Sequence, residues 1–278
     1  MITYRLLSAD DSTSLFECFL HGFSDYQVQL RMTREQFEQR LVRDGVRLEI
    51  SVGAFDGDRM VGFYINALGE WQGKQTAYDA GTGVIPAYRR QGIAEELFAF
   101  MAPRLREFGA EQYLLEVLTG NERALALYRK LGFVETRRLA VFRPTDPVIQ
   151  PDHSSIRRVE KPDWDLFKSF WDGYPAWQSS SDAVDRVANR RIMVCAYVDD
   201  RCVGYGVALP GGSLMHLAVA REHRRRGIGT ALLAALQREV TESFKVNNID
   251  EELKEMIGFF EARGFEIMLE QYEMITGF

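Results

Sequence analysis

The sequence has little cysteine and no long apolar run, and each scarcity excludes a class of protein. Its 3 cysteines are scattered among 278 residues and form neither a disulfide framework nor the C-x-x-C spacing of a metal site. No apolar run approaches the roughly 18 residues of a membrane span, and the first five residues open no basic-then-apolar signal pattern. We therefore expect a protein of the reducing cytoplasm that neither crosses nor binds a membrane.

Basic charge is also scarce. The sequence carries 34 Lys and Arg against 40 Asp and Glu, for a net charge of -6. Proteins that bind nucleic acid neutralise phosphates with an excess of Lys and Arg, so no nucleic-acid partner is expected. The four histidines form no spaced ligand set, so no metal is expected either. The length suggests two globular domains of about 150 residues each.

The chain repeats itself. Residues 54–63 and 196–205 are identical at five of ten positions, and each segment is typical of a β-hairpin. The motif at 89–94 is repeated at 224–229, in the same order along each half. A proline-rich segment between the halves indicates a linker. We predict an α/β protein with an N-terminal domain at 1–143, a linker at 144–153 and a C-terminal domain at 154–278.

The repeated motif lies between a predicted strand, Tyr78–Ile85, and a helical pattern that begins near Leu97. A helix N-terminus presents unpaired N–H groups, and glycine lets a ligand approach the backbone closely. Arg89 and Arg90 add charged donors, so the turn is suited to a phosphate. The alternative is an exposed basic turn, but the repetition favours the phosphate. Neither a P-loop nor a Rossmann glycine motif is present.

A second motif follows in the first half. Residues 121–132 are typical of a short helix, with Asn121 at its N-terminus and Tyr128 two turns further along the same face. Alone, these residues are better explained as a helix cap and a core tyrosine. Together, R-x-x-G-x-A followed by N-x-x-A-x-x-x-Y-x-x-x-G-F closely resembles the GNAT superfamily of N-acetyltransferases. Both halves match, so the chain resembles a tandem GNAT protein.

The resemblance implies a mixed sheet with helices on both faces in each domain, and acetyl-CoA bound where two parallel strands splay apart. Members of the superfamily transfer acetyl directly to an amine, and by analogy Tyr128 would protonate the departing thiolate. The residues that it implies for acetyl-CoA are Val84, Ile85, Pro86, Arg89, Arg90, Gln91, Gly92, Ile93, Ala94 and Asn121, with Arg224, Arg225, Arg226, Gly227, Ile228 and Gly229 in the second half.

The reaction also needs a base and an acceptor pocket. An attacking ammonium must first lose a proton, and Glu116 and Asp79 are the candidate bases on the predicted strands. Each carboxylate is as readily explained by solvent or by a salt bridge. The fold usually admits its acceptor between the early helices, which points to Phe23, Asp25 and Tyr26. The expected acceptor is a primary amine of a small molecule or a peptide.

The second half departs from the pattern. Phe260 stands where the spacing places Tyr128, and Leu253 stands where it places Asn121. Because a phenyl ring donates no proton, the second domain is expected to be degenerate. It would be a scaffold, a CoA site without this chemistry, or an enzyme with another acid such as Tyr272. For the whole chain, the alternative function is a non-catalytic acyl-CoA-binding or scaffold protein, as a monomeric pseudo-dimer or a homodimer.

Overall fold

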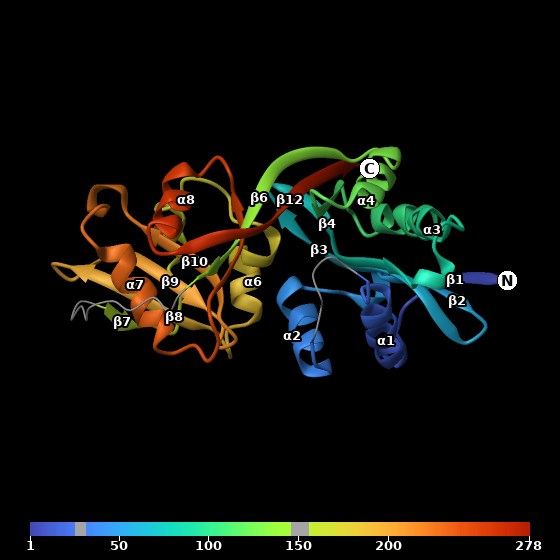
Figure 1. Ribbon diagram of the computed structural model, residues 1–278, viewed down its shortest axis with the longest axis horizontal. Helices are drawn as coiled ribbons and strands as arrows, with labels where there is room; N and C mark the ends of the chain where they lie inside the picture. Colours follow the sequence, from blue (N-terminus) through green and yellow to red (C-terminus); the bar gives the residue numbers. More distant parts are fainter. Residues whose placement is uncertain (26–31, 146–155) are drawn as a thin grey trace. The chain divides into compact units, whose positions relative to one another are not determined.

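The computed structural model describes residues 1–25, 32–145 and 156–278, and these residues form two compact units (Figure 1). Unit 1 comprises Met1–Thr136 and Tyr272–Phe278, and unit 2 comprises Arg137–Gln271. Each unit is a mixed β-sheet with helices on both faces, which confirms the predicted fold class. Most of the predicted linker lies outside the described residues, so the boundary at 144–153 stays a prediction.

The sheet of unit 1 has the strand order β1-β2-β3-β4-β5, followed by the end of β12 and the start of β6. The strands are β1 (Ile2–Leu6), β2 (Val52–Asp56), β3 (Arg59–Trp71), β4 (Lys74–Val84), β5 (Gln112–Leu118), β6 (Val134–Pro144) and β12 (Phe265–Gly277). The pairs from β1 to β4 are antiparallel, whereas β4 and β5 are parallel. The predicted hairpin at 54–63 is confirmed as β2 and β3.

The two faces of this sheet carry different helices. One face is covered by α1 (Ser12–Gly22) and α2 (Arg34–Asp44), and the other by α3 (Ile93–Glu107) and α4 (Glu122–Lys130) (Figure 1). A capping box at Thr33 begins α2, and Gly45, with φ 75°, ends it. α1 packs on β3 and β4, and α2 packs on α1, where the Phe37 and Phe19 rings meet with centroids 4.9 Å apart.

A bulge in β4 positions the site. Ile65 of β3 is paired with Gly81 and Asn66 with Asp79, so Ala80 is an extra residue. The extra residue reverses the alternation of side chains, and it brings Asp79 and Thr82 to the same face. The parallel pairing of β4 with β5 extends to Tyr78, the residue before Asp79. Asp79 therefore lies where the paired segments of the two parallel strands end.

Unit 2 repeats this arrangement. Its strands run β7-β8-β9-β10-β11-β6, with the start of β12 beside β6, and only β10 and β11 are parallel among the registers from β6 to β11. The strands and helices are β7 (Ile156–Arg158), β8 (Ile192–Val198), β9 (Arg201–Ala208), β10 (Ser213–Val219), β11 (Lys245–Asp250), α5 (Trp164–Lys168), α6 (Ser181–Arg186), α7 (Ile228–Gln237) and α8 (Lys254–Glu261). A register shift at Met215 of β10 matches the bulge at Ala80.

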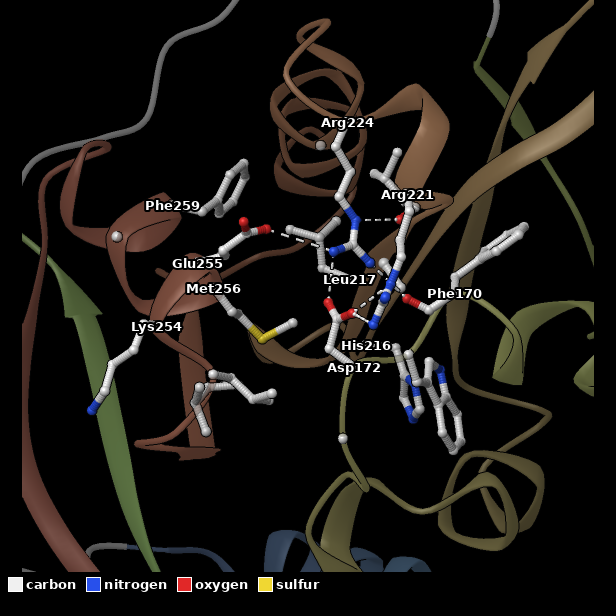
Figure 2. A pocket seen from close by; sticks show the side chains of 18 of the residues that line it. Phe170, Asp172, His216, Leu217, Arg221, Arg224, Lys254, Glu255, Met256 and Phe259 are labelled. Atoms are coloured by element: carbon white, nitrogen blue, oxygen red, sulfur yellow. Dashed lines mark hydrogen bonds and ion pairs between the residues drawn. The ribbon is translucent and has the colours of Figure 1, made fainter.

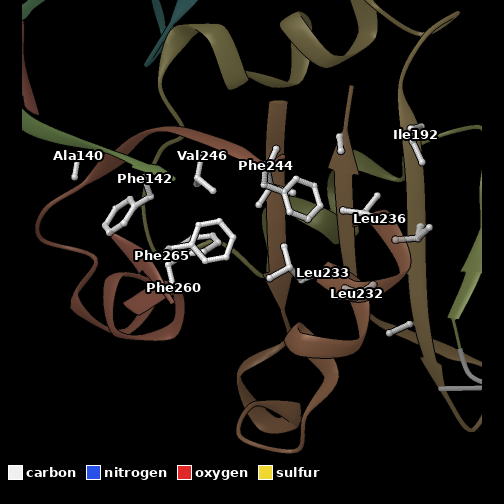
Figure 3. Packing of buried hydrophobic residues seen from close by; sticks show 14 of the residues in the cluster. Ala140, Phe142, Ile192, Leu232, Leu233, Leu236, Phe244, Val246, Phe260 and Phe265 are labelled. Carbon is white, nitrogen blue, oxygen red and sulfur yellow. The ribbon is translucent and has the colours of Figure 1, made fainter. Parts of the chain in front are cut away.

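One core cluster of unit 2 lies between its sheet and the helices α7 and α8 (Figure 3), and another includes residues of α5 and α6. Aromatic rings from three elements meet there, because Phe260 of α8 packs on Phe142 of β6 and on Phe265 of β12. Leu232, Leu233 and Leu236 of α7 fill the rest and are fully buried. Burying side chains of this size stabilises a fold by about 1.5–3 kcal/mol each.

Each unit is completed by a strand from the other half of the sequence, which the sequence did not predict. The end of β12 lies in unit 1, where Thr136 donates a hydrogen bond to the Glu273 carboxylate (2.8 Å). In the same unit, the Phe278 ring stacks on Tyr113, with centroids 6.1 Å apart. Most of β6, from Arg137 onward, lies in unit 2. Both exchanged strands thus contribute buried contacts to the unit that they enter.

Candidate active site

The turn between β4 and α3 in unit 1 has the geometry of an anion-binding loop. It passes through the short helix η3 (Pro86–Tyr88) and reaches α3 through Arg90 (φ 62°) and Gly92 (φ 78°). Gly92 is the N-cap of α3, and a Cβ added there would meet no atom within 4 Å. The glycine is therefore required by its backbone angle, and it leaves open space before the N–H groups of the helix.

The remaining residues predicted for this loop lie along it in order. Val84 ends β4, Ile85 is buried at the start of η3, and Gln91 donates to the Ala87 carbonyl (3.3 Å). Ile93 and Ala94 form the first turn of α3, so their N–H groups face the N-terminal end of the helix. The structure therefore brings together the predicted residues 84–94 as one strand–loop–helix segment.

Arg89 anchors the loop. Its guanidinium donates to the carbonyls of Val84 (3.0 Å) and Gly22 (2.8 Å) and makes a two-pronged contact with Asp25 (2.7 and 2.8 Å). This contact also holds the pKa of the Asp25 carboxyl below its usual value. Arg89 thus joins β4, the end of α1 and the start of the following loop. Asp25, predicted for the acceptor, is a partner of this arginine.

Asp79 is the buried carboxylate of the site. Its Oδ1 accepts from the Gly81 N–H (2.9 Å), and its Oδ2 accepts from the Thr82 hydroxyl (2.6 Å) and, at 3.5 Å, from the Tyr128 hydroxyl. Burial raises the pKa of Asp79 to about 6, although these hydrogen bonds and the charge of Arg40 act to lower it. The structure therefore places a predicted acid, Tyr128, beside a predicted base, Asp79.

The other candidate base has a different environment. Glu116 of β5 accepts a hydrogen bond from the Tyr78 hydroxyl (2.6 Å). Tyr78 and Asp79 are consecutive residues of β4, so their side chains project from opposite faces of the sheet. Glu116 thus lies across the sheet from the Asp79–Tyr128 pair.

The other predicted residues are placed as follows. Asn121 is the N-cap of α4, and its side chain accepts from the Ala124 N–H (3.2 Å). The Phe23 ring packs on Phe19, with centroids 4.8 Å apart, at the end of α1. Tyr26 lies outside the described residues. Asn121 therefore has a structural role as a cap, and Phe23 borders the face of the sheet that α1 covers.

Sequence reasoning missed two side chains that hold the candidate base. Thr82 reaches Asp79 only because the bulge at Ala80 turns both residues to one face. Arg40 of α2 donates to the carbonyl of the bulged residue Ala80 (2.7 Å). A bulge leaves no fixed mark in a single sequence, so neither contact had a signal that could be read beforehand.

Unit 2 contains a second loop of the same geometry between β10 and α7. Arg225 (φ 60°) and Gly227 (φ 82°) repeat the angles of Arg90 and Gly92, and Gly227 also faces open space. Arg224 repeats the contacts of Arg89, because it donates to the carbonyls of Val219 (2.9 Å) and Phe170 (3.1 Å) and pairs with Asp172 (2.7 Å). Arg226 is exposed, and Ile228 and Gly229 form the first turn of α7.

A cavity of about 910 Å³ lies in front of this second loop (Figure 2). Arg224 and Asp172 meet at one side of it, with Arg221 also donating to Asp172 (2.7 Å). His216 accepts from, or donates to, the Tyr205 hydroxyl (2.8 Å), and burial lowers the pKa of His216 to about 4. The histidine is therefore neutral at physiological pH, and the charge on this wall comes from the arginine–aspartate group.

The Asp79–Tyr128 pair of unit 1 has no counterpart in unit 2. Both β4 and β10 end four residues beyond the bulge, at Val84 and Val219, so Leu214 occupies the position of Asp79. Phe260 packs edge-on against Phe265 (5.2 Å) as Tyr128 packs against Phe133 (5.6 Å). Unit 2 thus combines the loop with an apolar environment at both positions.

Within residues 1–25, 32–145 and 156–278, no group of three or more His, Cys, Asp or Glu side chains could hold a metal ion. In the same ranges, no helix has the length and hydropathy needed to cross a membrane.

The fold and the loops define a class: an α/β protein of two related units, each with a glycine turn that leads into a helix at the end of a parallel strand pair. The Acetyltransferase (GNAT) family matches residues 12–133, and an Acetyltransferase (GNAT) domain matches residues 189–267. The chain belongs to the GNAT superfamily of acetyltransferases and contains two such domains in tandem.

Two curated relatives each match about a third of the chain. The chain is 37% identical over 86 residues to N-alpha-acetyltransferase MAK3 of Arabidopsis thaliana, covering 31% of this chain and 45% of that protein. It is 34% identical over 92 residues to N-alpha-acetyltransferase 30 of Schizosaccharomyces pombe, covering 33% of this chain and 61% of that protein. The chain thus spans about half the length of these relatives.

A solved structure resembles the whole chain. A tandem GNAT protein from the clavulanic acid biosynthesis pathway matches with a TM-score of 0.73 and 18% identity, over 100% of this chain and 98% of that one. A putative acetyltransferase from Pyrococcus horikoshii matches with a TM-score of 0.75 and 18% identity, over 100% of this chain and 89% of that one. At this identity the likeness shows the fold, and the predicted tandem arrangement is confirmed.

Proposed function

We propose that unit 1 is an acetyl-CoA-dependent N-acetyltransferase that acts on a primary amine of a small molecule or peptide. The observation that carries the proposal is the contact between the Tyr128 hydroxyl and the Asp79 carboxylate (3.5 Å) at the point where the pairing of β4 with β5 ends. A titratable pair with a perturbed pKa beside an anion-binding loop is the arrangement expected at an active site.

The loop at 89–94 suits the phosphates of acetyl-CoA. Gly92 leaves space before the N-terminus of α3, whose dipole and N–H groups favour an anion. Arg89 is already held by two carbonyls and Asp25, so its role in this proposal is to position the loop. When bound, acetyl-CoA supplies the activated acetyl group.

Asp79 is the proposed base. With a pKa of about 6 it is ionised at neutral pH, yet it is more basic than an ordinary carboxylate. It would take the proton that the acceptor ammonium must lose. Glu116 lies across the sheet and is hydrogen-bonded by Tyr78, which favours Asp79 over Glu116 for this role.

Tyr128 is the proposed acid. Its hydroxyl would donate a proton to the thiolate leaving group, and its contact with Asp79 offers a route by which the tyrosine regains a proton. The alternative, a non-catalytic acyl-CoA-binding protein, needs neither the hydroxyl nor the buried carboxylate.

The test is Tyr128→Phe in the full chain, with thiol release and acetylated product measured against a panel of small and peptide amines. We expect kcat to fall by about 10²–10⁴-fold, the usual contribution of a positioned acid, while acetyl-CoA binding is retained. Tyr4→Phe makes the same change on a half-buried residue of β1, outside the site, and serves as the control. Wild-type protein that binds acetyl-CoA but acetylates no amine would favour the non-catalytic alternative.

A further inference from the structure

The cavity of unit 2 has an apolar wall at positions where unit 1 is polar. Counting from the matching strand ends, Leu217 corresponds to Thr82, and Leu253 occupies the N-cap position that Asn121 occupies in α4. Both leucines line the cavity, and Met256 of α8 lines it beside them (Figure 2 labels Leu217 and Met256). An apolar wall of this kind favours an apolar part of a ligand.

The loop end of the cavity is suited to an anion. Gly227 and Ile228 at the start of α7 line it, and the open space at Gly227 gives access to the backbone N–H groups. Arg224 is held by Val219, Phe170 and Asp172, so it fixes the loop as Arg89 does. The cavity thus has an anion-binding end and an apolar wall, which together select an amphipathic ligand.

A buried amide supplies a third contact. Asn248 of β11 lines the cavity and is 5% exposed. Its Oδ1 accepts from Gln271 Nε2 (2.7 Å), while its Nδ2 is buried and has no hydrogen-bond partner among the described residues. A buried donor without a partner is costly to a protein, and a ligand carbonyl would satisfy it.

We propose that unit 2 binds, without transferring, a phosphopantetheine thioester whose acyl group is longer than acetyl. The phosphate would lie at the loop of Gly227, a carbonyl of the ligand would accept from Asn248, and the acyl chain would pack on Leu217, Leu253 and Met256. The acid–base pair proposed for unit 1 is not repeated, because Leu214 and Phe260 at its positions offer neither a base nor an acid. The proposal goes beyond the acetyl transfer assigned to unit 1 and does not depend on it.

Calorimetry tests the ligand class. The full chain carrying Gly92→Asp, which places a negative charge in the loop of unit 1, is titrated with CoA, acetyl-CoA and octanoyl-CoA. We expect one equivalent of octanoyl-CoA to bind at least tenfold more tightly than acetyl-CoA, because each additional buried methylene favours binding. Equal or weaker binding of octanoyl-CoA, or no binding, would overturn the proposal. Acetyl transfer does not enter this measurement, so a failure of unit 1 catalysis is a separate result.

Substitutions assign the contacts. Gly227→Asp should abolish binding of octanoyl-CoA, since Asp enters the left-handed region readily and its charge opposes a phosphate. Leu217→Thr restores the unit 1 residue and should lower the preference for octanoyl over acetyl at least threefold. Val240→Thr is a matched control, because Val240 packs on the same core and does not line the cavity. An unchanged preference in Leu217→Thr, with an unchanged melting temperature, would contradict the apolar wall.

Asn248→Leu tests the amide. Loss of the donor should weaken binding of acetyl-CoA and octanoyl-CoA by a similar factor of at least threefold, whereas tighter binding of both would contradict the contact.

Titration with S-octanoyl-4′-phosphopantetheine tests whether the phosphopantetheine part of the ligand is recognised without the rest of CoA. Binding as tight as that of octanoyl-CoA supports recognition of the phosphopantetheine alone, and binding of octanoyl-CoA only supports a free CoA thioester.

Discussion

The two units have the same loop and different chemistry beside it. In each, a residue with φ near 60° and a glycine with φ near 80° lead into a helix, and an arginine joins its own strand to the preceding helical segment. Beside the loop, unit 1 has Asp79, Thr82 and Tyr128, whereas unit 2 has Leu214, Leu217 and Phe260. The geometry of the loop is therefore the same in both units, while the polar side chains beside it in unit 1 are replaced by apolar ones in unit 2.

The packing around Tyr128 and Phe260 explains how unit 2 accommodates a phenylalanine where unit 1 has a tyrosine. Tyr128 and Phe260 both pack edge-on against the phenylalanine that begins or precedes the next strand, at 5.6 and 5.2 Å. The two side chains have nearly the same shape and differ by one hydroxyl, so the core is kept while the donor is lost. A phenylalanine at this position thus keeps the packing of unit 2 and removes the hydroxyl.

The largest effect is expected at the loops. Gly92→Asp should lower kcat/KM for acetyl-CoA by about 100-fold or more, because it places a negative charge where the phosphates are proposed to bind. Gly109→Asp is the control, since Gly109 has φ 87° and open space but lies at the other end of α3. The measurement is steady-state kinetics with acetyl-CoA varied. A loss of the same size in Gly227→Asp would place the reaction in unit 2 and contradict the comparison.

The pH dependence of kcat/KM should reveal Asp79. The raised pKa, about 6, keeps this carboxyl protonated to a higher pH than an ordinary aspartate. As a base it acts only when ionised, so kcat/KM should fall about tenfold per pH unit below pH 6. Thr82→Val removes a hydrogen bond that lowers this pKa and should move the acidic limb to higher pH. A profile that is flat from about pH 5 to pH 7 would exclude Asp79 as the base.

Phe260→Tyr restores the missing hydroxyl and should not restore the reaction. The double variant Tyr128→Phe/Phe260→Tyr is expected to be as inactive as Tyr128→Phe, because Leu214 leaves no carboxylate beside the new hydroxyl. The buried hydroxyl should lower the free energy of unfolding by about 1–3 kcal/mol, measured by chemical denaturation. Recovered acetyl transfer would show that the hydroxyl alone accounts for the expected difference in activity between the two units.

The smallest effect is expected at the ion pairs that anchor the loops. Asp25 is 56% exposed, and an exposed pair contributes about 0.2–1 kcal/mol, so Asp25→Asn should raise the KM for acetyl-CoA about threefold or less. High salt should reduce the difference from wild type. Asp172 pairs with both Arg221 and Arg224, so Asp172→Asn should destabilise its own loop more. A tenfold increase in the KM for acetyl-CoA in Asp25→Asn would indicate that Arg89 contacts the bound acetyl-CoA directly.

Much of the fold could be predicted because its signals are local. The hairpin at 54–63, the helix that begins before Leu97 and the glycines before α3 and α7 depend on turn chemistry, apolar periodicity and the left-handed conformation of glycine. The Asn121 cap was readable for the same reason. The bulge at Ala80 was not, and without it the two candidate bases could not be assigned to faces of the sheet.

The sequence by itself determined that the chain is a duplicated GNAT protein whose second copy lacks the tyrosine, because motif spacing and residue identity can be read from the order of residues alone. Only the tertiary structure decided that Asp79, Thr82 and Tyr128 meet, that Glu116 faces away, and that β6 and β12 each complete the other half's unit. These depend on contacts between residues far apart in the chain, and burial, which raises the pKa of Asp79, exists only once those contacts have formed.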